Sequence, residues 1–331
     1  MDHKPNILIV GSFVMDHFAT TRVFPREGET VLGVSSKKAP GGKGANQAVQ
    51  AARLGANVTM VGKLGRDSNA ETMIETCRAA GIHTEHFLFD DAADTGCSFI
   101  ILEQKPDGST ANRILVIPGA NMTIRPDEIA FLKDSIGQYD FVILQLEIPM
   151  EINEIVCRYA AGAGVPVMLN PAPSDVLSEE ILHRLAYISP NEHEAQNMTG
   201  IPIPVQPDDR MLIKARESAE HLRAQGAKNV IITLGENGAV NLSEKDFRYS
   251  PCVPDTHAID PTAAGDSFVA SFCCGICVGL DAEDALCFAN HAASLTVSRL
   301  GAMPSLPTLD EVIDHLKSHG KSFSRLDTLR G

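Results

Sequence analysis

The chain has 331 residues, 44% of them hydrophobic, which is enough to bury a large core as one α/β domain or as a domain with an insertion. Its formal net charge of −14 at pH 7 argues against nucleic acid or an anionic membrane as the main partner. No uninterrupted apolar run approaches the ~20 residues that span a bilayer, and the N-terminus lacks a signal-peptide pattern, so we expect a cytoplasmic protein.

Short apolar runs alternate along the chain with segments of helical period, which predicts an α/β fold with a mainly parallel sheet and helices on both faces. The predicted strands span residues 7–10, 58–61, 141–144, 165–169, 187–189 and 230–233. The predicted helices span residues 44–54, 70–80, 151–161, 191–199 and 212–225. Two segments, approximately 15–39 and 95–121, look extended instead and return to the α/β body. We expect a single domain over residues 1–331 with these two segments inserted, ending in a polar tail from residue 318.

A glycine-rich element, PGGKGANQA at residues 40–48, leads into the first predicted helix. It is not a P-loop, because Gly44 rather than Ser or Thr follows Lys43. Its backbone allows close approach, and an ammonium and an amide side chain accompany it, which suits hydrogen bonding to a polyhydroxylated small molecule. Taken alone, the element fits equally well a turn that enters a helix.

A second element, DPTAAGDSF at residues 260–268, places a carboxylate beside small residues where an apolar helix begins. Short side chains let the free N–H groups of a helix start approach an anion such as a phosphate. Asp266, on the first turn, would lie within reach of a hydroxyl presented to that anion. Phosphoryl transfer to an alcohol needs such a pair, although an isolated Gly-Asp is more often an ordinary helix start.

Together the two elements resemble the two signatures of the ribokinase-like (PfkB) family of sugar and nucleoside kinases. Further matching segments occur in the expected order and cover nearly the whole chain: GSFVMDHF at 11–18, LQLEIP at 144–149, LNPAP at 169–173, SPNEHEA at 189–195, ITLGENGA at 232–239 and SRLGAMPSLP at 298–307. The resemblance implies a ribokinase-like fold in which the segments 15–39 and 95–121 form a small β-sheet lid over the sugar. In this family the lid often pairs with another subunit, so we expect a homodimer.

The resemblance also implies a reaction: transfer of a phosphoryl group from Mg-ATP to the 5-hydroxyl of a pentose. Asp266 matches the general base, and Ala263, Ala264 and Gly265 match the anion hole. The positions that match sugar contacts are Val14, Asp16, Gly42, Lys43, Asn46 and Glu147. Asn191 and Glu194 match the region that organises phosphate and Mg²⁺ through water. The remaining positions that match the nucleotide site are Thr233, Gly235, Gly238, Gly265 and, near the adenine, Asn290.

Members of the family also bind a monovalent cation, usually K⁺, beside the anion hole. Most of its ligands would be backbone carbonyls, and the matching positions are Asp260, Thr262, Thr296, Arg299, Gly301 and Ser305. Pro261 replaces the threonine that is common after this aspartate. Proline lacks an N–H but keeps its carbonyl, so we expect the loop to keep its course with a stiffer backbone.

Val14 departs from the family pattern, which usually has asparagine two residues before the aspartate that matches Asp16. That amide helps to hold ribose, and valine cannot replace it. A sugar hydroxyl left buried and unpaired would cost about 1–3 kcal/mol, which favours a substrate without that hydroxyl. Relatives that act on 2-deoxyribose carry an apolar residue here. The matching segments favour D-ribose, with 2-deoxy-D-ribose, a nucleoside, or a non-catalytic sugar-binding regulator as alternatives.

Overall fold

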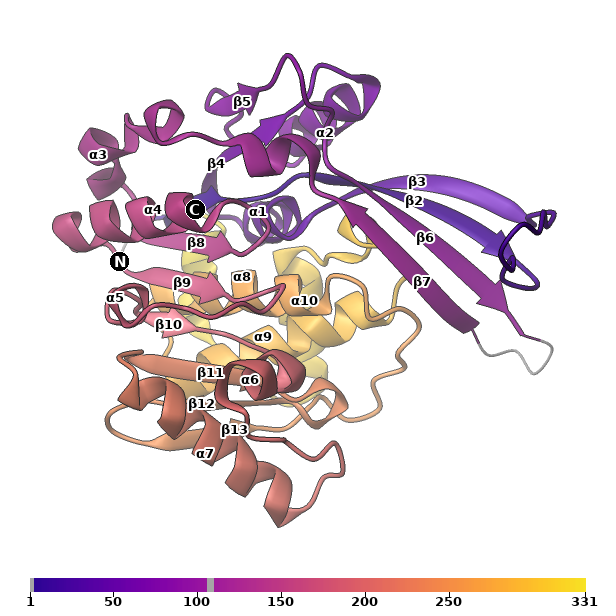
Figure 1. Cartoon of the computed structure of the whole chain (residues 1–331). Coiled ribbons are helices and arrows are strands. Elements are labelled where there is room, and N and C mark those ends of the chain that lie inside the picture. Colours follow the sequence, from indigo (N-terminus) through magenta and orange to yellow (C-terminus); the bar gives the residue numbers. More distant parts are fainter. Residues whose placement is uncertain (1–2, 106–109) are drawn as a thin grey trace.

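The computed structural model describes residues 3–105 and 110–331, and within them the strands form a nine-stranded and a four-stranded sheet (Figure 1). The order in the large sheet is β13-β12-β11-β10-β9-β8-β1-β4-β5. Its strands are β1 (Asn6–Val10), β4 (Asn57–Leu64), β5 (Phe87–Phe89), β8 (Phe141–Gln145), β9 (Val167–Asn170), β10 (Tyr187–Ile188), β11 (Asn229–Thr233), β12 (Ala239–Leu242) and β13 (Phe247–Ser250). The sheet is parallel except at β12 and β13, which form antiparallel pairs.

Helices cover both faces of the large sheet, as the sequence predicts. Along β1, Ile7 and Ile9 pack into one core while Leu8 and Val10 pack into the other, because successive side chains of a strand point to opposite faces. The first core includes residues of α1 (Lys43–Arg53), α2 (Ser68–Ala79), α8 (Ala264–Cys277), α9 (Ala282–Val297) and α10 (Leu309–Ser318). The second includes residues of α3 (Leu132–Ser135), α4 (Met150–Ala163), α5 (Glu179–Leu182), α6 (Glu192–Thr199) and α7 (Asp209–Ala224).

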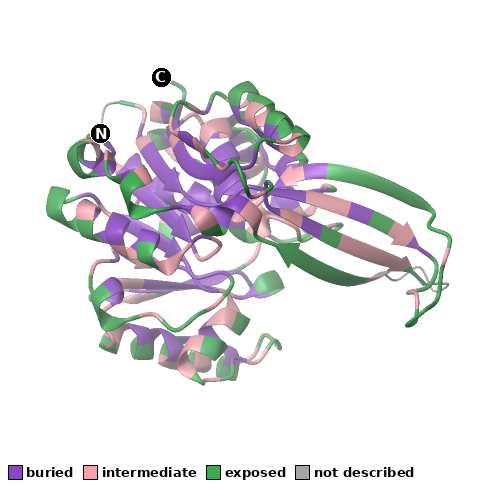
Figure 2. Cartoon of the chain, turned by 45° about the horizontal axis from the view of Figure 1, so that its top comes forward, coloured by how far each residue is buried: buried purple, intermediate pink, exposed green. Residues whose placement is uncertain are grey.

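The small sheet projects from the body, and much of its surface is exposed (Figures 1 and 2). Its order is β3-β2-β6-β7, and β2 and β6 are parallel whereas the outer pairs are antiparallel. The strands are β2 (Val14–Thr21), β3 (Ser35–Gly41), β6 (Cys97–Gln104) and β7 (Thr110–Ile117). The expectation of a second small sheet from these two segments is confirmed, with β2 and β3 reaching slightly beyond the predicted limits.

The predicted strands and helices of the body are all present, with boundaries within three residues of those expected. The prediction of a polar tail from residue 318 is wrong. Leu326 and Leu329 are each 1% exposed and belong to the first core, where a short 3₁₀ turn (Ser324–Leu329) brings them to one side. Gly55, at φ 99°, passes the Leu329 carbonyl so closely that a β-carbon would lie 2.1 Å from it. None of the described helices combines the length and apolar character needed to cross a bilayer.

Candidate active site

The start of α8 presents free backbone amides beside a carboxylate. The residue before the helix, Ala263, has φ 62°, a left-handed conformation that is unusual for a residue with a side chain, and no described side chain caps this helix. Within this first turn the Ala264 N–H donates to the Pro261 carbonyl at 3.2 Å, whereas the N–H groups of Gly265 and Asp266 have no described acceptor and are left for another partner. Apart from its chain neighbours and the backbone of α8 itself, no described atom lies within 4 Å of where a β-carbon on Gly265 would be, so the backbone is open to a ligand.

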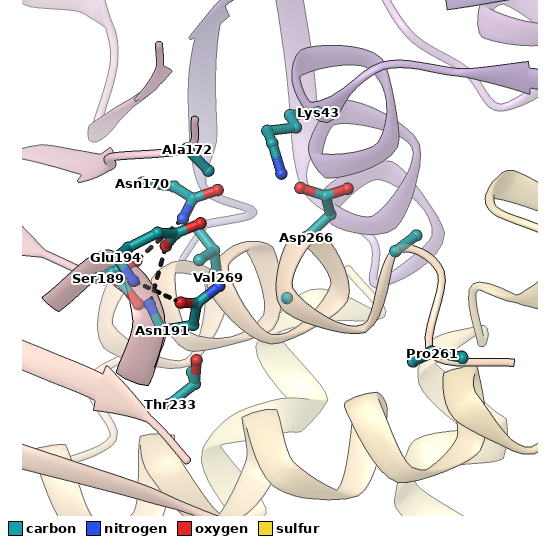
Figure 3. Close-up of a pocket in the computed structure, with 12 residues that line it drawn as sticks. Lys43, Asn170, Ala172, Ser189, Asn191, Glu194, Thr233, Pro261, Asp266 and Val269 are labelled. Atoms are coloured by element: carbon teal, nitrogen blue, oxygen red, sulfur yellow. Dashed lines mark hydrogen bonds between the residues drawn. The ribbon is translucent and has the colours of Figure 1, made fainter. Parts of the chain in front are cut away.

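The start of α1 lies against the turn between β1 and β2. Its preceding residue, Gly42, has φ 92° and lacks a side-chain cap from the described residues. A β-carbon on Gly42 would lie 2.6 Å from the Val14 nitrogen, and one on Gly44 would lie 2.5 Å from the Ser12 nitrogen. The glycines of the first motif thus allow α1 to begin in contact with this turn. Figure 3 shows Lys43, at the first position of α1, opposite Asp266.

Asp266 is 6% exposed and is held by two amides of α1. Asn46 Nδ2 donates to its Oδ2 at 2.8 Å, and Gln47 Nε2 donates to its Oδ1 at 3.0 Å. Burial raises the pKa of the Asp266 carboxyl, although Lys43 and the two amides oppose this shift. The arrangement gives a buried carboxylate of increased basicity, which suits a group that accepts a proton from a hydroxyl.

The Lys43 ammonium is surrounded by carboxylates. Burial alone would lower its pKa, but Asp266, Glu147 and Glu194 outweigh that effect and raise it, so the ammonium stays charged. A fixed positive charge facing Asp266 across the cavity can neutralise negative charge that develops on a bound anion.

The small sheet adds a second carboxylate to the site. Asp16 Oδ1 accepts a hydrogen bond from Ser98 Oγ at 2.5 Å. Burial raises the pKa of Asp16 to about 6; the Ser98 hydroxyl opposes this shift, and the negative charges of Glu147 and Asp266 add to it. Val14 is buried two residues earlier on the same face of β2, so it adjoins the same site.

Glu147 connects the turn after β1 to the start of α1. Its Oε2 accepts hydrogen bonds from Ser12 Oγ and, at 3.0 Å, from the backbone N–H of Lys43. The other oxygen of this carboxylate therefore stays available to a neighbouring hydroxyl. The sugar-contact positions predicted from the sequence, Val14, Asp16, Gly42, Lys43, Asn46 and Glu147, are thus brought together around Asp266.

A polar cavity of about 190 Å³ extends from Asp266 toward the start of α6 (Figure 3). Asn191 and Glu194 line it and are linked as a capping box. Asn191 Oδ1 accepts from the backbone N–H of Glu194 at 2.8 Å, and Glu194 Oε2 accepts from the N–H of Asn191 at 2.8 Å. Burial raises the pKa of Glu194, although the N–H of Asn191 and Lys43 oppose it. Thr233, at the end of β11, lines the same cavity.

Three other positions predicted to bind the nucleotide, Gly235, Gly238 and Asn290, do not line this cavity. Gly235 and Gly238 form the turn after β11, both with positive φ. Asn290, on α9, is outside the Asp266 cavity and lines a second one of about 310 Å³. Its Nδ2 donates to the Ser250 carbonyl at 3.1 Å and to Ser250 Oγ at 2.9 Å, so this amide group is engaged by the end of β13. The assignment of Asn290 to adenine stays a prediction.

Of the predicted monovalent-cation positions, three meet in one network. Asp260 Oδ1 accepts from the Thr262 N–H at 3.0 Å, and Oδ2 accepts from the Gly301 N–H at 2.9 Å. Burial would raise the pKa of Asp260, but these hydrogen bonds lower it and keep the group ionised. The side chains of the other positions point to different partners. Thr296 hydrogen-bonds to Ser267, Arg299 pairs with Glu311, and Ser305 donates to the Ala302 carbonyl.

Sequence reasoning missed several side chains that support the site. Gln47 contacts Asp266 and also lies 3.3 Å from Asn170, which lines the cavity. Ser12 and Ser98 position the carboxylates of Glu147 and Asp16. Gln47, Asn170 and Ser12 lie within the matching segments of the sequence, which was the available signal, whereas Ser98 had none.

Comparison with known proteins assigns the family. The pattern of the pfkB family of carbohydrate kinases matches residues 4–309. The chain belongs to this family. It is therefore a carbohydrate kinase, as its motifs predict. It is 38% identical over 307 residues to a ribokinase of Bacillus subtilis, covering 93% of this chain and 98% of the relative.

Two further comparisons bear on the fold and the substrate. The structure of Arabidopsis thaliana ribokinase complexed with ribose and ATP superposes with a TM-score of 0.84 at 30% identity, covering 95% of this chain and 99% of that one. The ribokinase-like fold is thereby confirmed. A deoxyribokinase of Salmonella typhi is 30% identical, covering 94% of this chain and 98% of the relative.

Proposed function

We propose that this carbohydrate kinase transfers the γ-phosphoryl group of ATP to the 5-hydroxyl of D-ribose. The observation that carries the proposal is the buried Asp266 carboxylate, held by Asn46 and Gln47 opposite Lys43 at the uncapped start of α8. The similarity to ribokinases, including one bound to ribose and ATP, supports both substrates.

In the proposed step, Asp266 accepts the proton of the sugar hydroxyl as its oxygen bonds to the γ-phosphorus. The bond from that phosphorus to the β–γ bridging oxygen breaks, and ADP leaves with the electron pair. The amides of Ala263, Ala264 and Gly265 would donate to the oxygens of the transferring group, with Ala264 exchanging its 3.2 Å hydrogen bond to the Pro261 carbonyl for one to a phosphoryl oxygen, and Lys43 would add a positive charge. Placing Asp16, Asn46 and Glu147 around the sugar orients the acceptor hydroxyl, so no covalent enzyme intermediate is needed.

Mg²⁺ would accompany ATP near Asn191 and Glu194. Glu194 uses one carboxylate oxygen for the Asn191 amide and keeps the other, and oxygen ligands in a polar cavity fit this ion. Because Mg²⁺ usually retains several waters, Glu194 would hold it through water. When bound, the ion neutralises charge on the phosphates. Thr233, Gly235 and Gly238 would adjoin the nucleotide.

A monovalent cation, K⁺ in our proposal, would bind between the loop at Asp260–Thr262 and the loop at Arg299–Ser305. The ionised Asp260 already ties the two loops together, and backbone carbonyls are ligands that K⁺ accepts. The site lies next to Ala263, so an ion there would fix the anion hole. We expect higher activity in K⁺ than in Na⁺ salts, and equal initial rates in K⁺, Na⁺ and Cs⁺ would contradict this part of the proposal.

The small sheet would act as a lid on a single functional unit spanning the whole chain. Closing over the sugar would exclude water and so limit hydrolysis of ATP. Its edge strand β7 exposes Ile114, Leu115, Val116 and Ile117, and Leu115 is 61% exposed. Such an uncovered apolar strand supports pairing with a second copy, as a homodimer. Sedimentation velocity at micromolar concentration should give twice the chain mass of 35.5 kDa, and a monomer would contradict it.

2-Deoxy-D-ribose is the second candidate substrate, and Val14 is the observation that favours it. This side chain is buried near Asp16 and offers no hydrogen bond to a sugar hydroxyl. The Salmonella typhi deoxyribokinase is among the similar proteins. The higher identity to the Bacillus subtilis ribokinase places D-ribose first.

The test is ADP release by the purified protein with Mg-ATP and K⁺, comparing kcat/KM for D-ribose, 2-deoxy-D-ribose and adenosine. We expect D-ribose to give the highest value. Preference for 2-deoxy-D-ribose would establish the second candidate, and preference for adenosine would indicate a nucleoside kinase. A protein that binds sugar but releases no ADP with any of the three would be a sugar-binding regulator, which contradicts the proposal.

A further inference from the structure

Three histidines that the proposed reaction does not use lie together between α9 and the end of α10. His291 is on α9, His315 is on the last turns of α10, and His319 is the residue that ends α10. One ring nitrogen from each lies within 4.8 Å of the other two. The ring centroids are 4.9, 5.2 and 4.7 Å apart. The three rings therefore converge on one point, from two helices that are neighbours in the first core.

The spacing of one pair of these nitrogens matches that of metal ligands. The Nδ1 atoms of His291 and His315 are 3.2 Å apart and share a hydrogen bond, which a bound metal ion would replace. Two nitrogen ligands of Zn²⁺ at 2.0–2.1 Å lie about 3.3 Å apart at a tetrahedral angle. His315 and His319 are four residues apart, a spacing that puts two side chains on the same side of a helix. Small rotations of the His319 ring would complete a set of three ligands.

Hydrogen bonding favours one tautomer of His319. Its Nδ1 lies 2.8 Å from the His315 carbonyl oxygen, which can only accept, so Nδ1 carries the proton and Nε2 keeps its lone pair. A ring N–H donated to a backbone carbonyl is the usual support of a metal-bound histidine. Among the described residues, the histidines that pair with carboxylates are His3 and His83, so an ion pair does not account for the cluster.

The cluster opens onto the cavity of about 310 Å³ that Asn290 also lines. His291 and His319 face this cavity together with Glu283, Asp284 and Cys287. The Asp284 carboxylate favours a cation there, whereas Glu283 is already paired with Arg248 at 3.1 Å, and Lys321, which lines the cavity too, opposes a cation. The cavity leaves space for a fourth ligand, such as a water. It shares no lining residue with the cavity of Asp266 among those described, so the histidines lie apart from the reacting groups, in the cavity whose Asn290 is the predicted adenine position.

We propose that His291, His315 and His319 bind one divalent transition-metal ion, with Zn²⁺ as the best match, and leave a fourth coordination position open toward this cavity. Three imidazole nitrogens suit Zn²⁺, Co²⁺, Ni²⁺ or Cu²⁺, whereas Mg²⁺ and Ca²⁺ prefer oxygen ligands. The ion would cross-link α9 to the end of α10. Because Asn290 precedes His291 and binds the end of β13 at Ser250, the ion would also fix one wall of the second cavity.

The test is calorimetric titration of the purified, chelator-treated chain with Zn²⁺ in a buffer that does not bind metals. We expect one high-affinity ion per chain and a higher Tm with Zn²⁺. His315→Ala and His319→Ala should each weaken binding at least about tenfold. His83→Ala, which removes an exposed histidine outside the cluster, is the matched control and should bind Zn²⁺ like the wild type.

His319 is exposed, so His319→Ala should fold normally, and circular dichroism of the metal-free variants checks this. Co²⁺ gives a second readout, since tetrahedral coordination produces visible absorption bands that should appear in the wild type and disappear in His315→Ala. Lack of stoichiometric Zn²⁺ binding by the wild type would overturn the proposal. So would binding that His315→Ala and His319→Ala leave unchanged, because other groups would then hold the ion.

Discussion

The start of α8 and the base of the small sheet each bring a carboxylate to the same site, but they hold it differently. Asp266 lies in the body, on the first turn of α8 where it faces α1. Amides from α1 hold both of its oxygens. Asp16 lies on a sheet that projects from the body, where its one hydrogen bond to a described side chain is with Ser98 on the neighbouring strand.

This difference suggests that the body and the small sheet have separate roles in the reaction. Groups that must keep an accurate position during phosphoryl transfer are on the rigid body, where helix starts and buried side chains fix them. Two of the proposed sugar contacts, Val14 and Asp16, are on the more exposed sheet, which we propose closes when substrate binds. Substitutions in the body should therefore change kcat, whereas substitutions on the small sheet should change KM and the choice of substrate.

The largest effect is expected at Asp266. Asp266→Asn keeps the size of the side chain but removes the base, so kcat should fall by about 10³-fold while the far-ultraviolet spectrum and Tm stay close to those of the wild type. The measurement is steady-state ADP release with D-ribose. Asp91→Asn, which changes an exposed aspartate paired with Arg66, is the control. A near-normal kcat in Asp266→Asn would show that Asp266 is not the general base.

The small sheet should determine specificity through Val14. Val14→Asn adds an amide beside Asp16 that can hydrogen-bond to a sugar hydroxyl. It should raise the ratio of kcat/KM for D-ribose to that for 2-deoxy-D-ribose by about tenfold. Val14→Ala shortens the same side chain without adding a polar group and controls for lost packing. An unchanged ratio in Val14→Asn, or the same change in Val14→Ala, would show that this position does not read the hydroxyl.

A smaller effect concerns stability and pH. The pKa of Asp16 is about 6 in the folded chain, against 3.8 for an ordinary aspartate. The folded state thus binds the proton of the Asp16 carboxyl more tightly than the unfolded state does. The stability gained from it is fully present below pH 3.8 and is lost as the pH rises through 6. Asp16→Asn should therefore stabilise the free protein at pH 7.5, by about 1–3 kcal/mol, and much less at pH 4.5.

Thermal unfolding at a series of pH values measures this effect. The difference in Tm between Asp16→Asn and the wild type should grow between pH 4.5 and 7. The same variant should raise KM for the sugar, because it loses a charged acceptor for a hydroxyl. A Tm difference that does not vary with pH would mean that ionised Asp16 does not destabilise the fold.

Much of the fold could be predicted from local pattern. The buried strands of the body are short apolar runs such as residues 141–144. The helices between them show the helical period of their apolar residues clearly. The tail was not predicted this way, because Phe323, Leu326 and Leu329 are three single apolar residues separated by polar ones in a short segment. Only the surface of the first core, far away in sequence, explains why Leu326 and Leu329 are buried.

The site was predictable where its residues lie in recognisable motifs. Asp266, Lys43 and Asn46 were named from glycine-rich segments and meet in the structure. Their supports were harder to foresee, since Gln47 lies 219 residues from Asp266 in the chain and its role depends on how α1 packs on α8. The histidine cluster was only partly visible in the sequence, because His315 and His319 are four residues apart but His291 comes from a different helix.

The central claim is that a pentose 5-hydroxyl is phosphorylated at the Asp266 site. The most direct measurement is the proton-coupled ³¹P spectrum of the product formed from Mg-ATP and D-ribose. The account predicts a phosphomonoester signal split into a triplet by the two protons on C5, and no such signal with Asp266→Asn. A doublet from the single proton on C1, or phosphate released without any sugar ester, would contradict it.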